Sequence, residues 1–116
     1  MHSEYKNNIP FEKRKTECDG VLKRYPDRIP CIIEMSKRCA FNKPEKTKFL
    51  IPQNLSIGQL QYIIRKRIKL SPDLAMFMFI NNILIPSSEE LQHVYHEHKD
   101  EDGFLYLVIT SESTFG

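Results

Sequence analysis

The stretch that decides the fold of this 116-residue chain is Lys48-Phe49-Leu50-Ile51-Pro52-Gln53-Asn54-Leu55-Ser56-Ile57-Gly58-Gln59-Leu60. Its first five residues are mostly apolar and close with a proline, a composition that predicts a short strand. Ser56 then stands at a helix start, and Gln59 follows three residues later to complete a capping box. The sequence therefore predicts a strand that leads, after a short connection, into a helix.

The predicted helix covers residues 56–68 and is amphipathic. Leu55 and Leu60 are positioned as a hydrophobic staple at its start. Its apolar residues recur at helical spacing, and a basic run lies mostly outside that stripe. The stripe consists of Ile57, Leu60, Ile64 and Ile68, and the basic run of Arg65, Lys66, Arg67 and Lys69.

Two further segments, residues 28–35 and 104–109, are apolar on both alternating faces. Such strands must be covered on both sides, so we expect them at the centre of a sheet. In the first, Ile29, Cys31 and Ile33 would face one layer, and Pro30 and Ile32 another. Because proline cannot donate to a ladder, Pro30 also indicates the beginning of a strand or a sheet edge.

The remaining patterns predict a helix over residues 11–24 after Pro10, preceded by a helical turn near 4–8. Residues 36–47 are expected to form a loop. Further along, the sequence predicts a strand over 76–80, a turn at Asn81-Asn82, an apolar piece at 83–86 and a third helix. Ser87 with Glu90 is the expected cap of the third helix, whose apolar face includes Leu91, Val94 and Tyr95.

This order of elements predicts an α+β fold: a ubiquitin-like β-grasp with an added N-terminal helical region. We expect residues 1–27 to form a helical extension across the second face of the sheet, residues 28–110 the ubiquitin-like core, and residues 111–116 a flexible tail.

Composition limits the class of protein. No apolar run approaches the roughly 18 residues that a membrane span needs, and the N-terminus lacks the apolar stretch of a signal peptide. Three cysteines without a Cys-x-x-Cys pair favour a reducing compartment, so we expect a cytoplasmic protein. Residues 29–70 carry nine basic and two acidic side chains, a net of +7, and residues 71–116 one and eight, a net of −7. This division can orient partners of opposite charge.

Several chemistries are disfavoured. His93, His96 and His98 lack a set of further ligands that would complete a metal site, so we expect no metal and no cofactor. Cys31 lies in an apolar strand, which raises a thiol pKa, so it is expected to be buried filler. The basic run in the predicted helix 56–68 permits nucleic-acid binding, but the even overall charge and the lack of interleaved aromatic residues argue against it.

Six stretches, in this order, resemble the autophagy ubiquitin-like modifiers, the family that includes GABARAP and the microtubule-associated light chains. They are Pro10-Phe11-Glu12-Lys13-Arg14-Lys15, Arg28-Ile29-Pro30, Lys48-Phe49-Leu50-Ile51-Pro52, Ile64-Arg65-Lys66-Arg67-Ile68, residues 95–106, and Ser113-Thr114-Phe115-Gly116. The resemblance spans the chain from residue 10 to its end and is weakest in the loop of residues 36–47.

The resemblance implies a protein tag and not an enzyme. An activating-like enzyme would adenylate the carboxylate of Gly116, a conjugating-like enzyme would accept it as a thioester, and the acyl group would pass to the amine of phosphatidylethanolamine. Glycine lacks a Cβ, so a terminal glycine on a loose tail can enter a narrow enzyme channel. A cysteine protease would process and delipidate the protein. The expected location is the cytoplasm, then the autophagosome membrane once lipidated, with the vacuole or lysosome as a further site.

The resemblance also implies a groove for short motifs of cargo receptors and adaptors, with an aromatic residue, two variable positions and an aliphatic residue. An extended peptide would add to the edge of strand 48–52. The expected aromatic pocket is Glu17, Val21, Pro30, Ile32, Lys48, Leu50 and Phe104; the aliphatic pocket is Phe49, Ile51, Pro52, Leu55, Leu60 and Ile63; and the residues that attract acidic flanks are Arg28, Lys46 and Lys48.

Alternatives remain open at this point. Core packing is the competing interpretation for each apolar pocket residue, Leu60 and Ile63 above all. Phe77 and Phe79 are expected either to form a second exposed surface for partners or to pack in the core. The alternative function is a non-conjugated trafficking or cytoskeletal adaptor that uses the same groove. We expect a monomer in solution and no nucleic-acid partner.

Overall fold

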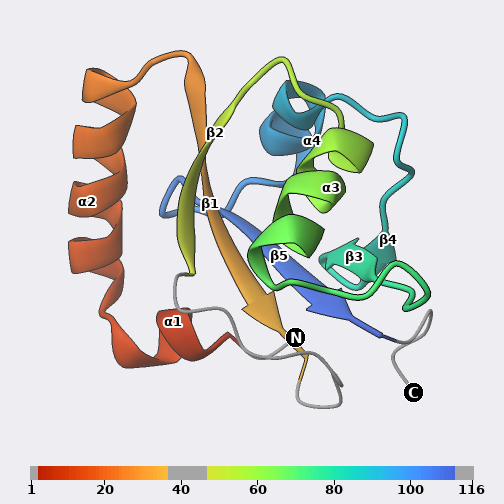
Figure 1. Ribbon diagram of the computed structural model, residues 1–116. Coiled ribbons are helices and arrows are strands. Elements are labelled where there is room, and N and C mark those ends of the chain that lie inside the picture. The colour runs from red at the N-terminus through yellow and green to blue at the C-terminus, as the bar shows by residue number, and fades with distance from the viewer. Residues whose placement is uncertain (1–2, 37–46, 112–116) are drawn as a thin grey trace.

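A computed structural model describes residues 3–36 and 47–111 of the chain. The elements, in chain order, are α1 (Glu4–Asn8), α2 (Phe11–Arg24), β1 (Arg28–Met35), β2 (Lys48–Pro52), α3 (Ile57–Arg67), β3 (Phe77–Ile80), β4 (Ile83–Leu84), α4 (Leu91–His98) and β5 (Leu105–Thr110). The five strands form one sheet in the order β2-β1-β5-β3-β4 (Figure 1). This is the predicted β-grasp with an N-terminal helical region.

The two segments with two apolar faces, β1 and β5, lie side by side in the sheet, as predicted. They run parallel, with Cys31 opposite Leu105 and Met35 opposite Ile109. β2 is antiparallel to β1, and β3 is antiparallel to β5. Pro30 precedes the first residue of β1 that pairs with β5, so its missing N–H costs no bond between these strands.

The alternating faces of β1 divide the apolar interior into two layers. Ile29, Cys31 and Ile33 belong to the main core beneath α3, whereas Ile32 packs with Cys18 of α2 and Phe104 on the other face. In Figure 1, α2 and α3 accordingly lie on opposite sides of β1 and β2. The predicted assignment of the N-terminal helix to the second face is confirmed.

The local signals at the element ends are mostly confirmed. α2 begins directly after Pro10, and the capping box of Ser56 and Gln59 is formed at the start of α3. Asn81 and Asn82 adopt φ values of 51° and 65°, the left-handed pair that a two-residue hairpin turn requires.

The predicted cap of α4 is wrong. This helix begins at Leu91, its N-cap is Glu90, and the side chain of Glu90 forms no capping hydrogen bond. Ser87 lies outside the helix, and its carbonyl accepts the N–H of Gly58 at 2.9 Å. Leu91 instead donates its N–H to the carbonyl of Leu55 at 2.8 Å, so main-chain contacts with the connection before α3 replace the side-chain cap.

A buried ion pair joins the N-terminal helices to the sheet. Arg14 of α2 donates from Nη1 to Oδ2 of Asp102 at 2.7 Å, and Asp102 has no exposed surface. The same carboxylate accepts the N–H of Phe104 at 2.8 Å and the hydroxyl of Tyr106. Arg14 also donates from Nε to the carbonyl of Ile9 at 3.0 Å, which holds the connection between α1 and α2.

The loop that carries Asp102 fits closely against α2. Gly103 has φ 96°, and a Cβ at this position would lie 2.7 Å from Sγ of Cys18. Both the backbone geometry and the contact therefore require glycine here. Within the described residues, no helix has the length and apolar character needed to cross a bilayer.

Removing the buried acid should strongly destabilise the fold. Asp102→Ala leaves Arg14 buried without its partner, so we expect a loss of about 3–5 kcal/mol in the free energy of unfolding, measured by urea denaturation. Asp19→Ala is the control, because its ion pair with Lys15 is exposed and should contribute less than about 0.5 kcal/mol. Equal effects of the two substitutions would contradict the assigned role.

Candidate functional site

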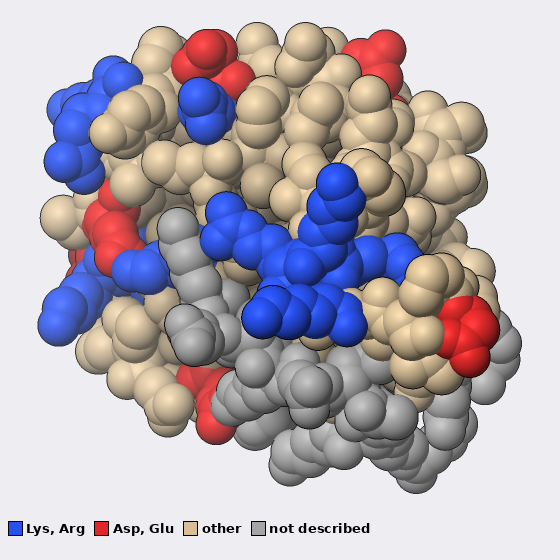
Figure 2. All heavy atoms as spheres, viewed as in Figure 1, with Lys and Arg blue, Asp and Glu red and all other residues tan. Residues whose placement is uncertain are grey.

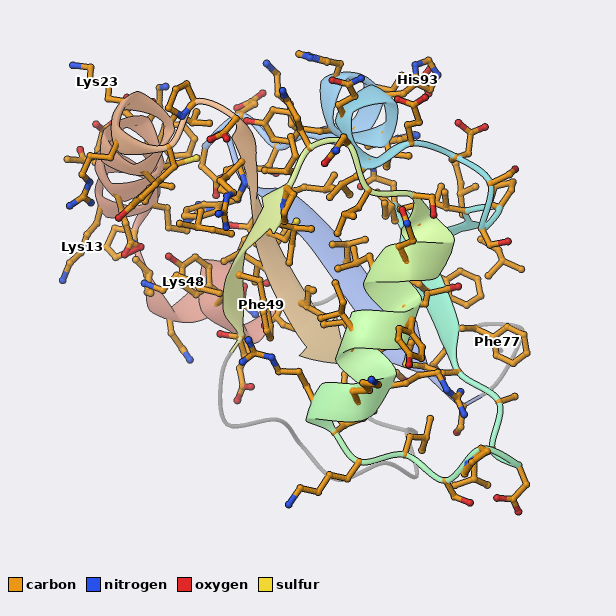
Figure 3. The ribbon with its side chains drawn as sticks, turned by 45° about the horizontal axis from the view of Figure 1, so that its top comes forward. Lys13, Lys23, Lys48, Phe49, Phe77 and His93 are labelled. Carbon is orange, nitrogen blue, oxygen red and sulfur yellow. The ribbon has the colours of Figure 1, made fainter. Side chains whose placement is uncertain are left out.

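β2 is an edge strand, and its alternating side chains serve two different faces of the sheet. Lys48 and Leu50 lie opposite Ile32 and Pro30 on the face that carries α2, whereas Phe49 and Ile51 join the core beneath α3. Figure 3 shows the side chain of Lys48 in the gap between β2 and α2, with Phe49 on the other side of the strand. One short strand thus contributes to both predicted pockets.

The outer edge of β2 offers main-chain hydrogen-bonding groups. Ile33 donates its N–H to the carbonyl of Thr47 at 2.9 Å, which sets the alternation along the β1–β2 ladder. In an antiparallel ladder, every second residue directs its N–H and C=O away from the partner strand. For β2 these residues are Lys48 and Leu50, and no other described strand pairs with that edge.

The residues predicted for the aromatic pocket come together between α2 and the sheet. Ile32 and Phe104 form the floor and are 0% and 3% exposed. Pro30 is also buried, and Val21 of α2 and Leu50 of β2 are half-buried. Leu22 of α2, which was not predicted for the pocket, packs against this cluster. Glu17 of α2 and Lys48 of β2 meet across the opening.

A polar bridge joins α2 and β2 at the predicted aromatic pocket. Nζ of Lys48 donates to both carboxylate oxygens of Glu17, at 2.6 and 2.8 Å. The hydroxyl of Tyr5 donates to the same carboxylate at 3.1 Å. Hydrogen bonding from Lys48 and then from Tyr5 holds the pKa of the Glu17 carboxyl below its ordinary value, against the opposing effect of burial. The carboxylate is therefore charged at neutral pH.

The residues predicted for the aliphatic pocket lie between β2 and α3 at two depths. Leu55, Pro52 and Ile63 are half-buried and reach the surface. Phe49 and Ile51 are buried, at 6% and 5% exposed. Leu60 is completely buried, so the core-packing alternative describes it, and it supports the pocket from below because its position on α3 faces the sheet.

Basic side chains gather around the same edge. Arg28 is exposed at the start of β1, whereas Lys46 lies outside the described residues. Figure 2 shows a cluster of Lys and Arg over the C-terminal end of α3, where Arg65, Lys66 and Arg67 form the last turn. The guanidinium of Arg67 lies 5.5 Å from the ring centroid of Phe49, so a cation covers part of the aliphatic side.

The predicted second surface is only partly present. Phe77 and Phe79 lie on one face of β3, and Figure 3 shows Phe77 far from Lys48 and Phe49. Phe77 is half-buried, but Phe79 is only 4% exposed. Phe79 lies opposite Val108 of β5 and Leu84 of β4, so packing within the sheet describes it better than an exposed patch.

In the part of the chain that the structure describes, the remaining reactive side chains form no second site. Cys18 and Cys31 are free and buried. Burial raises the pKa of the Cys18 thiol to about 12 and raises that of Cys31 as well, so both are poor nucleophiles. His93 contacts Glu97 at 3.1 Å on the exposed face of α4. Within residues 3–36 and 47–111, no group of three or more potential ligands is arranged to hold a metal ion.

Two further residues at the site were not predicted from the sequence. Tyr5 contacts the aromatic pocket from α1, and Arg67 covers Phe49 from α3. Arg67 was noted only as part of a basic run, and no periodic pattern points to Tyr5. A signal for Arg67 is present in its spacing, since it lies three residues after Ile64 and four after Ile63 on one side of the helix.

A small sheet crossed by a helix, with helices added at the N-terminus, defines a ubiquitin-like protein. The sequence profile of the family described as "Autophagy protein Atg8 ubiquitin like" matches residues 13–116. The chain belongs to this family, as the resemblance indicated.

Curated relatives support the assignment over the whole chain. The autophagy-related protein 8 of Schizosaccharomyces pombe is 48% identical over 116 residues, which cover 100% of this chain and 96% of that protein. The protein of the same name from Aspergillus niger is 47% identical, with 100% and 98% covered. The match therefore includes the groove and the C-terminal residues.

Solved structures of the family share the fold. The crystal structure of Trypanosoma brucei ATG8 superposes with a TM-score of 0.93 at 38% identity and covers 100% of both chains. Plasmodium falciparum Atg8, solved in complex with a P. falciparum Atg3 peptide, gives a TM-score of 0.89 at 34% identity, with 99% of this chain and 100% of that chain covered.

Breaking the polar bridge should shift the titration of Glu17. Lys48→Ala removes the strongest stabiliser of the charged carboxylate, so the Glu17 pKa should rise toward its ordinary value. A carboxyl-carbon NMR titration of the two proteins measures this. Because the folded-state pKa is lowered, the contribution of the pair to stability is present above the unfolded-state pKa and is lost as the pH falls through the folded-state value. Identical titration curves would show that Lys48 does not control the carboxylate.

Proposed function

We propose that this chain is a ubiquitin-like modifier of autophagy, conjugated through Gly116 to phosphatidylethanolamine, and that it binds aromatic-x-x-aliphatic motifs at the edge of β2. The observation that carries the motif-binding part is the position of β2. Among the described residues no strand pairs with its outer edge, and its adjacent side chains lie on opposite faces of the sheet.

The main chain supplies affinity without regard to sequence. An extended peptide that pairs with β2 bonds to the outward N–H and C=O groups of Lys48 and Leu50. Pro52 has no N–H and ends the edge, which limits pairing to a short segment. A short paired segment suits a motif of four residues, because only the first and last side chains need a pocket.

The pockets supply selectivity. On the α2 side, the floor of Ile32 and Phe104 suits an aromatic side chain. On the α3 side, Leu55, Pro52 and Ile63 offer half-buried apolar surface for an aliphatic side chain. Arg28, Lys46 and Lys48 attract acidic residues that flank the motif, an effect that weakens with salt.

The conjugation part of the proposal rests on the family and on its partners. The P. falciparum relative was solved with an Atg3 peptide, which supports an Atg3-like conjugating enzyme as a partner of this chain. In the proposed reaction, this chain supplies only the carboxylate of Gly116, and its enzymes supply the nucleophilic cysteines, so it is not itself an enzyme. The two acyl chains of the lipid then anchor the protein to the membrane.

The proposal assigns a role to each part of the chain. Residues 1–27 are a helical extension that completes the aromatic pocket, residues 28–110 are the ubiquitin-like core, and residues 111–116 are the conjugation tail. Before conjugation the protein is a cytoplasmic monomer. After conjugation it lies on the autophagosome membrane, from which it reaches the vacuole or lysosome or is released by a delipidating cysteine protease.

Truncating the shared wall of the groove should weaken motif binding. Leu50 lies on the α2 face beside the open edge, and Leu50→Ala removes apolar contact with the aromatic residue of a bound peptide. We expect about a tenfold loss of affinity, equivalent to about 1.4 kcal/mol, in calorimetric titration with an aromatic-x-x-aliphatic peptide. Leu74→Ala is the control, since Leu74 is 47% exposed and is not a groove residue. Unchanged affinity of Leu50→Ala would reject the groove.

Conjugation should depend on the last residue. Liposomes containing phosphatidylethanolamine, incubated with activating and conjugating enzymes, should yield a lipid-modified wild type and an unmodified Gly116→Ala, since a Cβ obstructs a channel shaped for glycine. Intact-mass spectrometry of the membrane-bound protein detects the added lipid. Absence of lipid on wild-type protein recovered from membranes would instead favour the non-conjugated adaptor.

A further inference from the structure

Helix α1 has no fully buried residue and is attached by polar groups and by the partly buried ring of Tyr5. The hydroxyl of Ser3 donates to Glu34 of β1 at 2.6 Å, and the N–H of Tyr5 donates to the same carboxylate at 3.0 Å. Lys6 forms an ion pair with Asp100 in the loop before β5. These contacts with β1 and with the loop before β5 hold α1 in place, and they thereby position the side chain of Tyr5.

The ring of Tyr5 lies against residues of the aromatic pocket. Its centroid is 5.8 Å from that of Phe104 in an edge-to-face arrangement of 80°, and Nζ of Lys48 lies 5.8 Å from it. The ring packs on the layer formed by Cys18, Ile32 and Phe104. Together with the bond from its hydroxyl to Glu17, Tyr5 touches three of the seven residues predicted for this pocket.

We infer that Tyr5 is a specificity-determining residue of the aromatic pocket: its ring forms the wall at the α1 end and selects aromatic over aliphatic side chains at the first motif position. The inference rests on the proposed motif-binding function and adds to it a residue from outside the β-grasp core. It follows from the arrangement of Tyr5, Phe104 and Lys48 around one opening.

The selectivity follows from the geometry of aromatic pairs. An aromatic side chain that packs beside the Glu17–Lys48 bridge lies near two rings, since Tyr5 and Phe104 are 5.8 Å apart and nearly perpendicular. Edge-to-face and offset contacts stabilise an aromatic side chain beyond the area that it buries. An aliphatic side chain gains only the buried area. Loss of the Tyr5 ring therefore weakens the two kinds of motif by different factors.

The ring and the hydroxyl of Tyr5 have separable roles. The hydroxyl bonds to Glu17 and helps to orient the carboxylate that holds Lys48. The ring supplies the wall itself. Tyr5→Phe keeps the wall and removes the hydrogen bond, so it is the conservative variant that distinguishes an aromatic wall from a polar contact.

The test compares two dye-labelled peptides that differ at one position, acidic residues followed by Trp-x-x-Leu or by Leu-x-x-Leu, in fluorescence anisotropy titrations. Tyr5→Ala should weaken the Trp peptide about five- to tenfold and the Leu peptide no more than about twofold. Tyr5→Phe should remain within about twofold of wild type for both peptides. Tyr25→Ala is the control, because Tyr25 is 46% exposed at the other end of α2.

Each outcome is decisive. The inference is overturned, with the groove itself left intact, by any of three results. Tyr5→Ala loses equal affinity for both peptides, Tyr5→Ala loses affinity for neither, or Tyr5→Phe binds as weakly as Tyr5→Ala. Failure of wild type to bind either peptide would overturn the proposed function itself. The chain contains no Trp, so a blue shift of the peptide's Trp emission on wild type, reduced in Tyr5→Ala, reports directly on burial of that side chain.

Discussion

The position of α2 depends on one buried contact, the ion pair of Arg14 and Asp102. Desolvation offsets much of the attraction within such a pair, so its contribution lies more in geometry than in net stability. Asp102 also accepts the N–H of Phe104. One carboxylate therefore positions both α2, through Arg14, and Phe104 of the proposed aromatic pocket. The spacing between α2 and the sheet is therefore set by a contact that lies outside the residues of the proposed groove.

The proposed groove rests on a common property of strands. Side chains alternate across any strand, and β2 differs only in that helices cover both faces while its edge stays open. Lys48 and Leu50 thus face α2, and Phe49 and Ile51 face α3. A ligand that lies along the edge has access to both layers at once, which requires the N-terminal helices as much as the ubiquitin-like core.

Sequence patterns predicted the elements well where local chemistry decides them, as at the capping box of Ser56 and in the two-faced strand 28–35. They predicted the α4 cap wrongly, because the helix begins only at Leu91, whose N–H bonds to the carbonyl of Leu55, a tertiary contact that no local pattern reports. Periodicity also does not report depth, so Leu60 and Ile63 looked alike although only Leu60 is fully buried. Tyr5 was missed because its contacts are all tertiary.

The parallel pairing of β1 with β5 has a consequence for how the molecule forms. Cys31 pairs with Leu105, so the centre of the sheet joins two segments near opposite ends of the sequence. Contacts of such long sequence separation are slow to form, because a large loop must close before they are gained. During synthesis the segments of β1 and β2 leave the ribosome before β5, so the edge of β1 that pairs with β5 stays unpaired until β5 is available. Until β5 pairs with β1, the central edge of this hairpin therefore exposes apolar surface and unpaired main-chain groups.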